Sequence, residues 1–199
     1  MNRTGRHVSI ELERYGFYPP GGGRLHLRIE PSSSRNRIDL FERGEIRSQR
    51  ARGLVVNLPP GIAERELGVI REELGWVDAQ LQLEISNNAS SPGNVLTIEI
   101  ESEQLTEVIT GIGERGVRAE TVALRAVKEA QQYLLHGAPV GEHLADQLLI
   151  PLALAGGGSY LTGAPTLHTT TNIEIIKRFL NVDITVAPMS DEIWKIEVS

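Results

Sequence analysis

Two short stretches near the start of the chain alternate between apolar and polar residues. The stretches are 8–12 and 25–29, and in both of them every second residue is Val, Leu or Ile. A period of two places one face of a strand on a core and the opposite face in solvent. We therefore predict two paired strands, joined by the loop RYGFYPPGGGR at 14–24.

A mixed pattern of strands and helices follows the segment PSSSRNR at 31–37, which has the composition of a linker. A helix at 59–75 is entered through two prolines and carries apolar residues at a helical spacing. A longer helix runs from Ala119 to Leu135 and is ended by Gly137. The strand-like runs in this part of the chain are 52–58, 79–86, 94–102 and 107–113.

The last part of the chain predicts a buried helix within 140–158, followed by a short strand within 159–164. Pro151 lies inside this helix and predicts a kink or a break, because proline has no backbone N–H to donate. A short amphipathic helix at 172–180 and a final hairpin complete the pattern. The apolar residues expected on the buried face of the first helix are Leu144, Leu148, Leu152 and Ala155.

These elements together predict an α+β fold. The block 36–136 has strands and helices of its own, so we interpret it as a smaller α/β domain inserted into a parent domain. The parent domain would then consist of 1–35 and 137–199.

Composition and charge narrow the possible functions. The chain has 199 residues, of which 40% are hydrophobic and none is cysteine, so disulfides and thiolate chemistry are excluded. A formal charge of −6 argues against general phosphate-driven nucleic-acid binding but leaves room for a local basic pocket. The sequence shows no signal peptide and no apolar run long enough to cross a bilayer, so we expect a cytoplasmic protein.

Two glycine-rich segments invite a comparison with nucleotide-binding loops. GIGERG at 111–116 matches the G-x-G-x-x-G pattern, but a strand that ends in an acid does not follow its helix. A glycine-rich turn that enters a helix is therefore the better interpretation. YPPGGGR at 18–24 lacks the G-K-[ST] ending of a P-loop, and a flexible hairpin tip is favoured over an anion-binding loop.

A run of arginines leads into the middle block, with acidic residues between them. It could face RNA, or it could form a solvated strand face with paired charges, and the sequence leaves both interpretations open. The arginines are Arg35, Arg37, Arg43, Arg47, Arg50 and Arg52, and the acids are Asp39, Glu42 and Glu45.

The segment EHLADQ places polar residues in an otherwise apolar helix. His143 and Asp146 are three residues apart and hence neighbours on one face, but two ligands alone are weak evidence for a metal. We interpret Asp146 and Gln147 as part of a polar notch that faces a ligand. The alternative is that they point to solvent from the early turns of the helix.

The segment PTLHTTTNI at 165–173 places a histidine just before a predicted helix. Thr171 and Glu174 form a capping-box pattern, which predicts a helix start near Asn172. Helix N-termini bind phosphate readily, and a neutral imidazole beside bound phosphate suits nucleophilic phosphoryl or nucleotidyl transfer. A histidine that is hydrogen-bonded within a loop is the alternative for His168.

Three of these segments together resemble the RNA 3′-terminal phosphate cyclase family. They are RYGFYPPGGG, VGEHLADQLLIPLALAGGG and PTLHTTTNIEIIKRFL, in the order in which the family has them. The last two are specific to the family, and the likeness runs through essentially the whole chain. The resemblance implies repeated βαβαββ units with a smaller α/β domain inserted between the second and the third, which agrees with the middle block.

The resemblance also implies an enzyme that uses ATP to convert an RNA 3′-terminal phosphate into a 2′,3′-cyclic phosphate through an adenylylated histidine. The family's histidine falls on His168. A divalent metal, Mg²⁺ or Mn²⁺, is expected with ATP, although the sequence identifies no ligands for it. The family's nucleotide-binding segment falls on His143, Leu144, Ala145, Asp146 and Gln147.

One difference from the family concerns its long amino-terminal portion, whose Gly-rich motif and arginines serve the ATP and RNA phosphates. This chain shows no counterpart, so we expect a carboxy-terminal part of a cyclase that can be inactive alone. Apolar surface would then be exposed, to be covered by a homodimer partner or by the missing repeats. The alternative function is a non-catalytic cyclase-like factor in RNA processing or ribosome biogenesis; that branch lacks the histidine, so His168 favours the enzyme.

Overall fold

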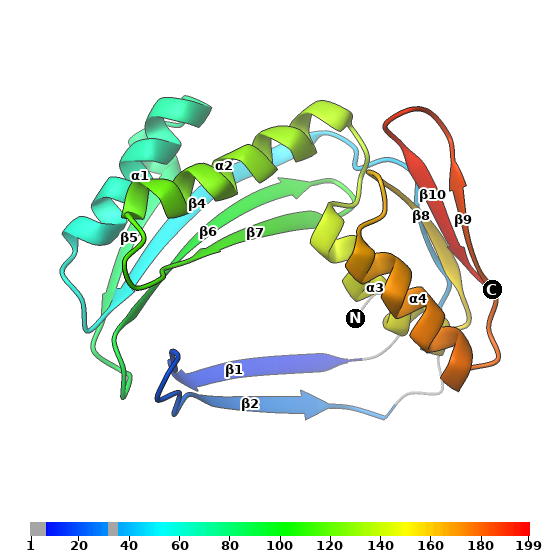
Figure 1. Cartoon of the computed structure of the whole chain (residues 1–199), viewed down its shortest axis with the longest axis horizontal. Helices are drawn as coiled ribbons and strands as arrows, with labels where there is room; N and C mark the ends of the chain where they lie inside the picture. The colour runs from blue at the N-terminus through cyan, green and yellow to red at the C-terminus, as the bar shows by residue number, and fades with distance from the viewer. Residues whose placement is uncertain (1–6, 32–35) are drawn as a thin grey trace.

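The computed structural model of the chain describes residues 7–31 and 36–199. These residues form two four-stranded sheets, each with helices on one face, and a separate two-stranded hairpin (Figure 1). The strands are β1 Val8–Arg14, β2 Arg24–Ile29, β3 Ile38–Leu40, β4 Ile46–Val56, β5 Leu81–Ser86, β6 Gly93–Ser102, β7 Thr106–Ile112, β8 Gly158–Thr162, β9 Ile184–Pro188 and β10 Trp194–Val198. The helices are α1 Gly61–Leu74, α2 Ala119–His136, α3 Glu142–Ala155, α4 Leu167–Phe179 and the short 3-10 helix η2 Asp78–Gln80.

The first sheet is built from the middle of the chain, in the order β5-β4-β6-β7. β4 is parallel to β5, and the other neighbours are antiparallel. Helices α1 and α2 lie side by side on one face, where Ile70 and Val127 share a core with Leu96 (Figure 1). Gly53 allows the close approach of α1 to β4, because a Cβ there would lie 2.9 Å from the Cβ of Ala63. The predicted strands and helices of this part are confirmed.

The second sheet has the order β3-β8-β10-β9. β3 is parallel to β8, whereas β10 is antiparallel to both of its neighbours. Helices α3 and α4 cover one face, and their Leu149 and Ile173 pack in one core with Ile196 of β10. Residues 38–40 pair with β8 although they lie in the block 36–136. The domain limits at 35 and 136 stay predictions.

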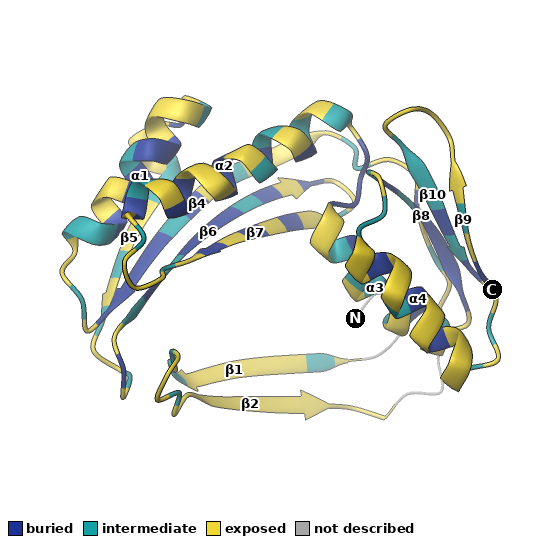
Figure 2. Cartoon of the chain, viewed as in Figure 1, coloured by how far each residue is buried: buried dark blue, intermediate teal, exposed yellow. Residues whose placement is uncertain are grey.

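The hairpin β1–β2 is confirmed, but none of the other described residues covers its apolar face. Cross-strand pairing places its apolar side chains opposite one another, and Figure 2 shows that nearly all of both strands is exposed. Along each strand these side chains alternate with charged ones such as Glu13, which binds Arg24 and His26. The apolar residues that are more than half exposed are Ile10, Leu12, Leu25, Leu27 and Ile29.

The tip of this hairpin is anchored to the first sheet. The backbone N–H of Phe17 donates to Ser91 Oγ at 3.1 Å, and that hydroxyl donates to the Phe17 carbonyl oxygen at 3.0 Å. The Tyr15 hydroxyl donates to Glu84 Oε1 at 2.8 Å. A Cβ on Gly93 would lie 2.2 Å from the Phe17 ring, so the glycine makes room for the aromatic side chain. These contacts fix the loop at 14–24, which we predicted to be a flexible hairpin tip.

Tyr133 ties together the two chain segments that connect the sheets. Its hydroxyl donates to the Pro139 carbonyl oxygen at 3.0 Å, within the connection from α2 to α3. Arg43, in the connection from β3 to β4, donates to the carbonyl oxygens of Tyr133 and Leu134 at 3.0 and 3.1 Å. The Arg43 guanidinium also lies 5.0 Å from the centre of the Tyr133 ring. The two connections are therefore bound to each other.

Helix α3 continues through Pro151, so the break, one of the two outcomes that we predicted there, does not occur. Leu149 and Leu152, on either side of the proline, are both fully buried, and this packing holds the helix together where one hydrogen bond is lost. The buried face consists of Ala145, Leu149, Leu152 and Ala155. Leu144 and Leu148, which we expected on it, are only half-buried at its edge. Within the described ranges, no helix is long and apolar enough to cross a membrane.

Candidate functional site

Helices α3 and α4 bring the two family-like segments together. Residues 143–147 lie in the first turns of α3, and Asp146 Oδ1 accepts a hydrogen bond from Asn172 Nδ2 of α4 at 2.8 Å. The Asp146 backbone carbonyl oxygen lies 3.4 Å from the same amide. Asp146 is half-buried, so the polar notch that we predicted is used, at least in part, to join the two helices.

His168 lies inside the first turn of α4, and the predicted capping box is wrong. The helix begins at Leu167, and its N-cap is Thr166, whose Oγ1 accepts from the Thr169 backbone N–H at 3.2 Å. The Thr166 hydroxyl accepts this backbone N–H by itself, and no glutamate three residues later is needed. The helix therefore starts about one turn before Asn172. His168 is exposed, and because it precedes Asn172 by four residues, both lie on the same face of α4.

The remaining residues of the α3 segment have different surroundings. His143 is exposed, and its Nε2 lies 3.5 Å from Glu129 Oε1 of α2. Ala145 is buried, and its carbonyl oxygen accepts from the Tyr160 hydroxyl at 2.5 Å. Leu144 is half-buried, and Gln147 is exposed. His143 thus turns to α2 while Asp146 turns to α4, and no group of three or more His, Cys, Asp or Glu able to hold a metal occurs among the described residues.

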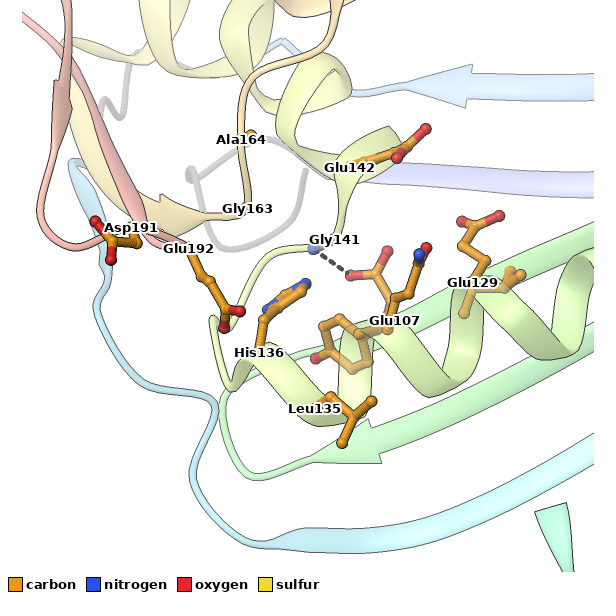
Figure 3. Close-up of a pocket in the computed structure, with 13 residues that line it drawn as sticks. Glu107, Glu129, Leu135, His136, Gly141, Glu142, Gly163, Ala164, Asp191 and Glu192 are labelled. Atoms are coloured by element: carbon orange, nitrogen blue, oxygen red, sulfur yellow. Dashed lines mark hydrogen bonds between the residues drawn. The ribbon is translucent and has the colours of Figure 1, made fainter.

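A buried glutamate of the first sheet holds the start of α3. Glu107 of β7 is 2% exposed, and its Oε2 accepts from the backbone N–H of Gly141, the N-cap of α3, at 3.0 Å (Figure 3). A Cβ on Gly141 would lie 2.5 Å from Glu107 Oε1, so the close approach requires glycine. Burial raises the pKa of Glu107 to about 7, against the opposing effect of the Gly141 hydrogen bond.

Sequence reasoning missed Glu107, although a signal for it exists. In the alternating run 107–113, Glu107 has the same parity as Ile109, which is buried. A charged residue at a core-facing position needs a partner. The partner itself, the backbone N–H at the start of α3, depends on the tertiary arrangement and leaves no trace in the local pattern.

A pocket of about 500 Å³ lies beside Glu107, between the two sheets (Figure 3). Its other walls include His136, whose pKa is lowered by burial and by Arg43, and Gly163 in the loop after β8. Most of the charged side chains that line the pocket are acidic. Acidic side chains repel phosphate groups, so the pocket is unsuited to a triphosphate or an RNA end. The carboxyl groups that line it belong to Glu107, Glu129, Glu142, Asp191 and Glu192.

The described arginines of the run at 35–52 are paired with acids or carbonyl oxygens of the chain itself. Arg35 lies outside the described residues, and Arg43 binds the carbonyl oxygens of α2. This favours the interpretation as a strand face with paired charges over an RNA-facing strip. The ion pairs of the other members are Arg37 with Asp39 and Glu197, Arg47 with Glu103, Arg50 with Glu99, and Arg52 with Glu84.

The segment GIGERG forms the end of β7 and the turn into α2, as the glycine-rich-turn interpretation predicted. β7 is antiparallel to β6, and α3 follows α2, so the segment does not belong to a βαβ unit. Gly113 is needed because a Cβ there would lie 1.8 Å from Asn94 Oδ1, and Gly116 has a φ of 86°.

Comparisons with known proteins agree with the family-like segments of α3 and α4. The family model of RNA 3′-terminal phosphate cyclase matches residues 1–186. The chain is 44% identical over 198 residues to the RNA 3′-terminal phosphate cyclase of Ectopseudomonas mendocina (strain ymp). This alignment covers 100% of the chain and 58% of that protein. It is 43% identical over 187 residues to the same enzyme of Koribacter versatilis (strain Ellin345), covering 94% of the chain and 53% of that protein.

The chain therefore spans a little over half the length of these relatives. The matched part includes the helix that carries His168 and the segment 143–147. From the match of the family model and the identity to these relatives, we conclude that the chain belongs to the RNA 3′-terminal phosphate cyclase family.

Proposed function

We propose that the chain takes part in the ATP-dependent conversion of an RNA 3′-terminal phosphate into a 2′,3′-cyclic phosphate, with His168 as the nucleophile. The observation that carries the proposal is the bond between Asp146 and Asn172. It joins the segment 143–147, which we propose binds the nucleotide, to the helix that carries His168. Family membership supports the reaction class, and the bond between the two helices supports a role for both segments at one nucleotide.

The chemistry begins at the start of α4. His168 is exposed there, at a helix end whose partial positive charge favours an approaching phosphate. An imidazole nitrogen attacks the α-phosphorus of ATP; an N–P bond forms, the bond to the bridging oxygen breaks, and pyrophosphate leaves with the electron pair. The imidazole then holds AMP.

Two further transfers complete the reaction. An oxygen of the RNA 3′-phosphate attacks the phosphorus of the held AMP, the N–P bond breaks, and the imidazole is restored. The 2′-hydroxyl then attacks the 3′-phosphorus, the phosphoanhydride bond breaks and AMP leaves. The hydroxyl proton passes to a base or to water. The product is the 2′,3′-cyclic phosphate.

The described residues offer a place for ATP but no cluster of ligands for a divalent metal. Residues 143–147 would hold ATP, and Asp146 is already fixed in position by Asn172. A divalent metal, Mg²⁺ or Mn²⁺, is expected with ATP, but the described part of the chain offers no cluster of three metal-ligating side chains. We therefore assign no step to the cation.

We also propose a partner for the apolar face of the hairpin and a division of the chain into domains. The face formed by Ile10, Leu12 and their partners on β2 is suited to a second copy of the chain or to a portion of the relatives that this chain does not span. The domains are the inserted unit 36–136 and the parent unit of 1–35 and 137–199.

The test is covalent labelling with ATP that is radioactive at the α-phosphate, in the presence of Mg²⁺ or Mn²⁺. We expect a protein-bound label that is labile in acid and stable in base, as a phosphoramidate is. His168→Ala should abolish the label, and His26→Ala, which removes another exposed histidine, should retain it.

The outcomes separate two questions. Equal labelling of the His168→Ala variant would refute the nucleophile. No label on a chain shown to be folded would refute catalysis by this chain alone. It would favour the alternative function as a non-catalytic factor in RNA processing or ribosome biogenesis, or a need for the part of the relatives that the chain does not span.

A further inference from the structure

A second pocket, of about 700 Å³, lies at the end of β7 opposite Glu107. It is bounded by the hairpin tip, the start of α1 and the turn 113–118 that contains most of the GIGERG segment. Its volume is in the range of sites that enclose a small organic ligand. Neither His168 nor the segment 143–147 contributes to it.

One of the residues that line this pocket has a carboxyl oxygen without a partner. Glu66 of α1 is fully buried, and its Oε1 accepts from Asn94 Nδ2 of β6 at 2.6 Å. Its Oε2 is buried and has no hydrogen-bond partner among the described residues. A buried acceptor without a donor is unfavourable, and it points to a donor that a bound ligand would supply.

The rim of the pocket is suited to a phosphate group. Arg115 is exposed and has no ion pair with the described residues, whereas Arg65 and Arg118 share the single carboxylate of Glu120. Helices α1 and α2 both begin at this pocket, and neither has a side-chain cap. Free guanidinium N–H groups and helix N-termini are the groups that bind phosphate in proteins.

The mouth of the pocket carries an aromatic ring. Tyr18 is 94% exposed, and it follows Phe17, which is anchored to Ser91. An exposed ring at the edge of a pocket, on a loop whose backbone is anchored one residue away, is a surface on which a base can stack.

We propose that this pocket binds a nucleotide unit, with its phosphate at Arg115, its base stacked on Tyr18 and an N–H of the base donated to Glu66. This site is separate from the proposed active site. The unit could be part of an RNA strand or a free nucleoside monophosphate, which share this chemistry. Gly113 allows the turn to approach Asn94 closely enough to form the pocket.

The experiment is an NMR titration of the whole chain that follows the backbone amides of Gly113 and Gly116. The probes are guanosine 5′-monophosphate, ribose 5-phosphate, and a short RNA that ends in a 3′-hydroxyl and is therefore not a substrate for cyclisation. We expect the nucleotide and the RNA to shift these amides. Arg115→Gln should weaken binding of all probes about tenfold, because a charged hydrogen bond is lost. Arg71→Gln, on the same unit but outside the pocket, is the matched control and should have no effect.

Glu66→Gln tests the contact to the base. It should weaken binding of the nucleotide at least about fivefold but leave that of ribose 5-phosphate unchanged, since only the base contact is altered. His168→Ala should bind every probe as the parent chain does, so a failure of the proposed catalysis leaves this test intact. Binding of the RNA alone would identify an RNA strand as the ligand. Shifts at α4 instead of the turn, equal binding by the Arg115 and Arg71 variants, or no shift with either the RNA or the nucleotide at millimolar concentration would overturn the proposal.

Discussion

Replacement of Glu107 by glutamine should make the chain more stable at alkaline pH. It should also remove the part of the pH dependence of the unfolding free energy that comes from this carboxyl. The pKa of Glu107 is about 7 in the folded chain, chiefly because of burial, and it returns to its ordinary value of 4.5 on unfolding. Because the folded value is the higher one, the contribution of this carboxyl is fully present below pH 4.5 and is lost as the pH rises through 7.

The magnitude follows from the size of the shift. One pKa unit corresponds to about 1.4 kcal/mol, so a change from 4.5 to about 7 corresponds to roughly 3 kcal/mol of unfolding free energy. Glutamine cannot ionise, and its amide oxygen can still accept the Gly141 N–H. The difference in stability between Glu107→Gln and the parent chain should therefore shift by about 3 kcal/mol in favour of the variant between pH 4.5 and pH 8.5.

Urea unfolding of both chains at pH 4.5, 7 and 8.5 measures this difference. Glu64→Gln, an exposed position on α1, controls for the removal of one negative charge. A stability difference between Glu107→Gln and the parent chain that does not change with pH would refute the reasoning. Loss of folding in the variant at every pH would show that a carboxyl group, rather than any acceptor oxygen, is required at the start of α3.

Three further substitutions test contacts that position the proposed sites. Gly141→Ala should lower the unfolding free energy by about 1–3 kcal/mol, because its Cβ would lie 2.5 Å from a Glu107 oxygen; urea unfolding measures this. Asn172→Ala should cost about 1 kcal/mol through the lost bond to Asp146 and reduce labelling by ATP, whereas unchanged stability and labelling would contradict a joining role. Phe17→Ala should release the hairpin tip, seen as faster amide hydrogen exchange of Phe17 and Gly21.

Much of the fold could be predicted because its signals are local. The alternation in β1 and β2, the prolines before α1 and the Gly137 C-cap of α2 all act within a few residues. Packing decides between outcomes that the local pattern leaves open, and a neighbouring residue can outweigh a local rule. Pro151 remains within α3 because both of its flanks are buried, and Thr166 takes the capping role that we had given to Thr171.

The candidate site was only partly predictable. His168 and the segment 143–147 were identified by family resemblance, whereas the bond between Asp146 and Asn172 joins residues 26 positions apart. For Glu66, as for Glu107, the sequence indicates burial but does not identify the hydrogen-bond partner. It shares a helical face with Ile62 and Ile70, which marks it as buried, but only the fold shows that Asn94 satisfies one of its oxygens.

The contacts of Tyr133 have a consequence for how the chain unfolds. Tyr133 lies in the core of the first sheet, yet its hydroxyl bonds to the segment that leads to the second, and Arg43 reaches it from the other connecting segment. If one sheet unfolded alone, it would leave buried polar groups of the other without partners. Each sheet therefore depends on its neighbour, and denaturation should follow a single cooperative transition with coincident optical signals from Trp76 in the first sheet's core and Trp194 in β10.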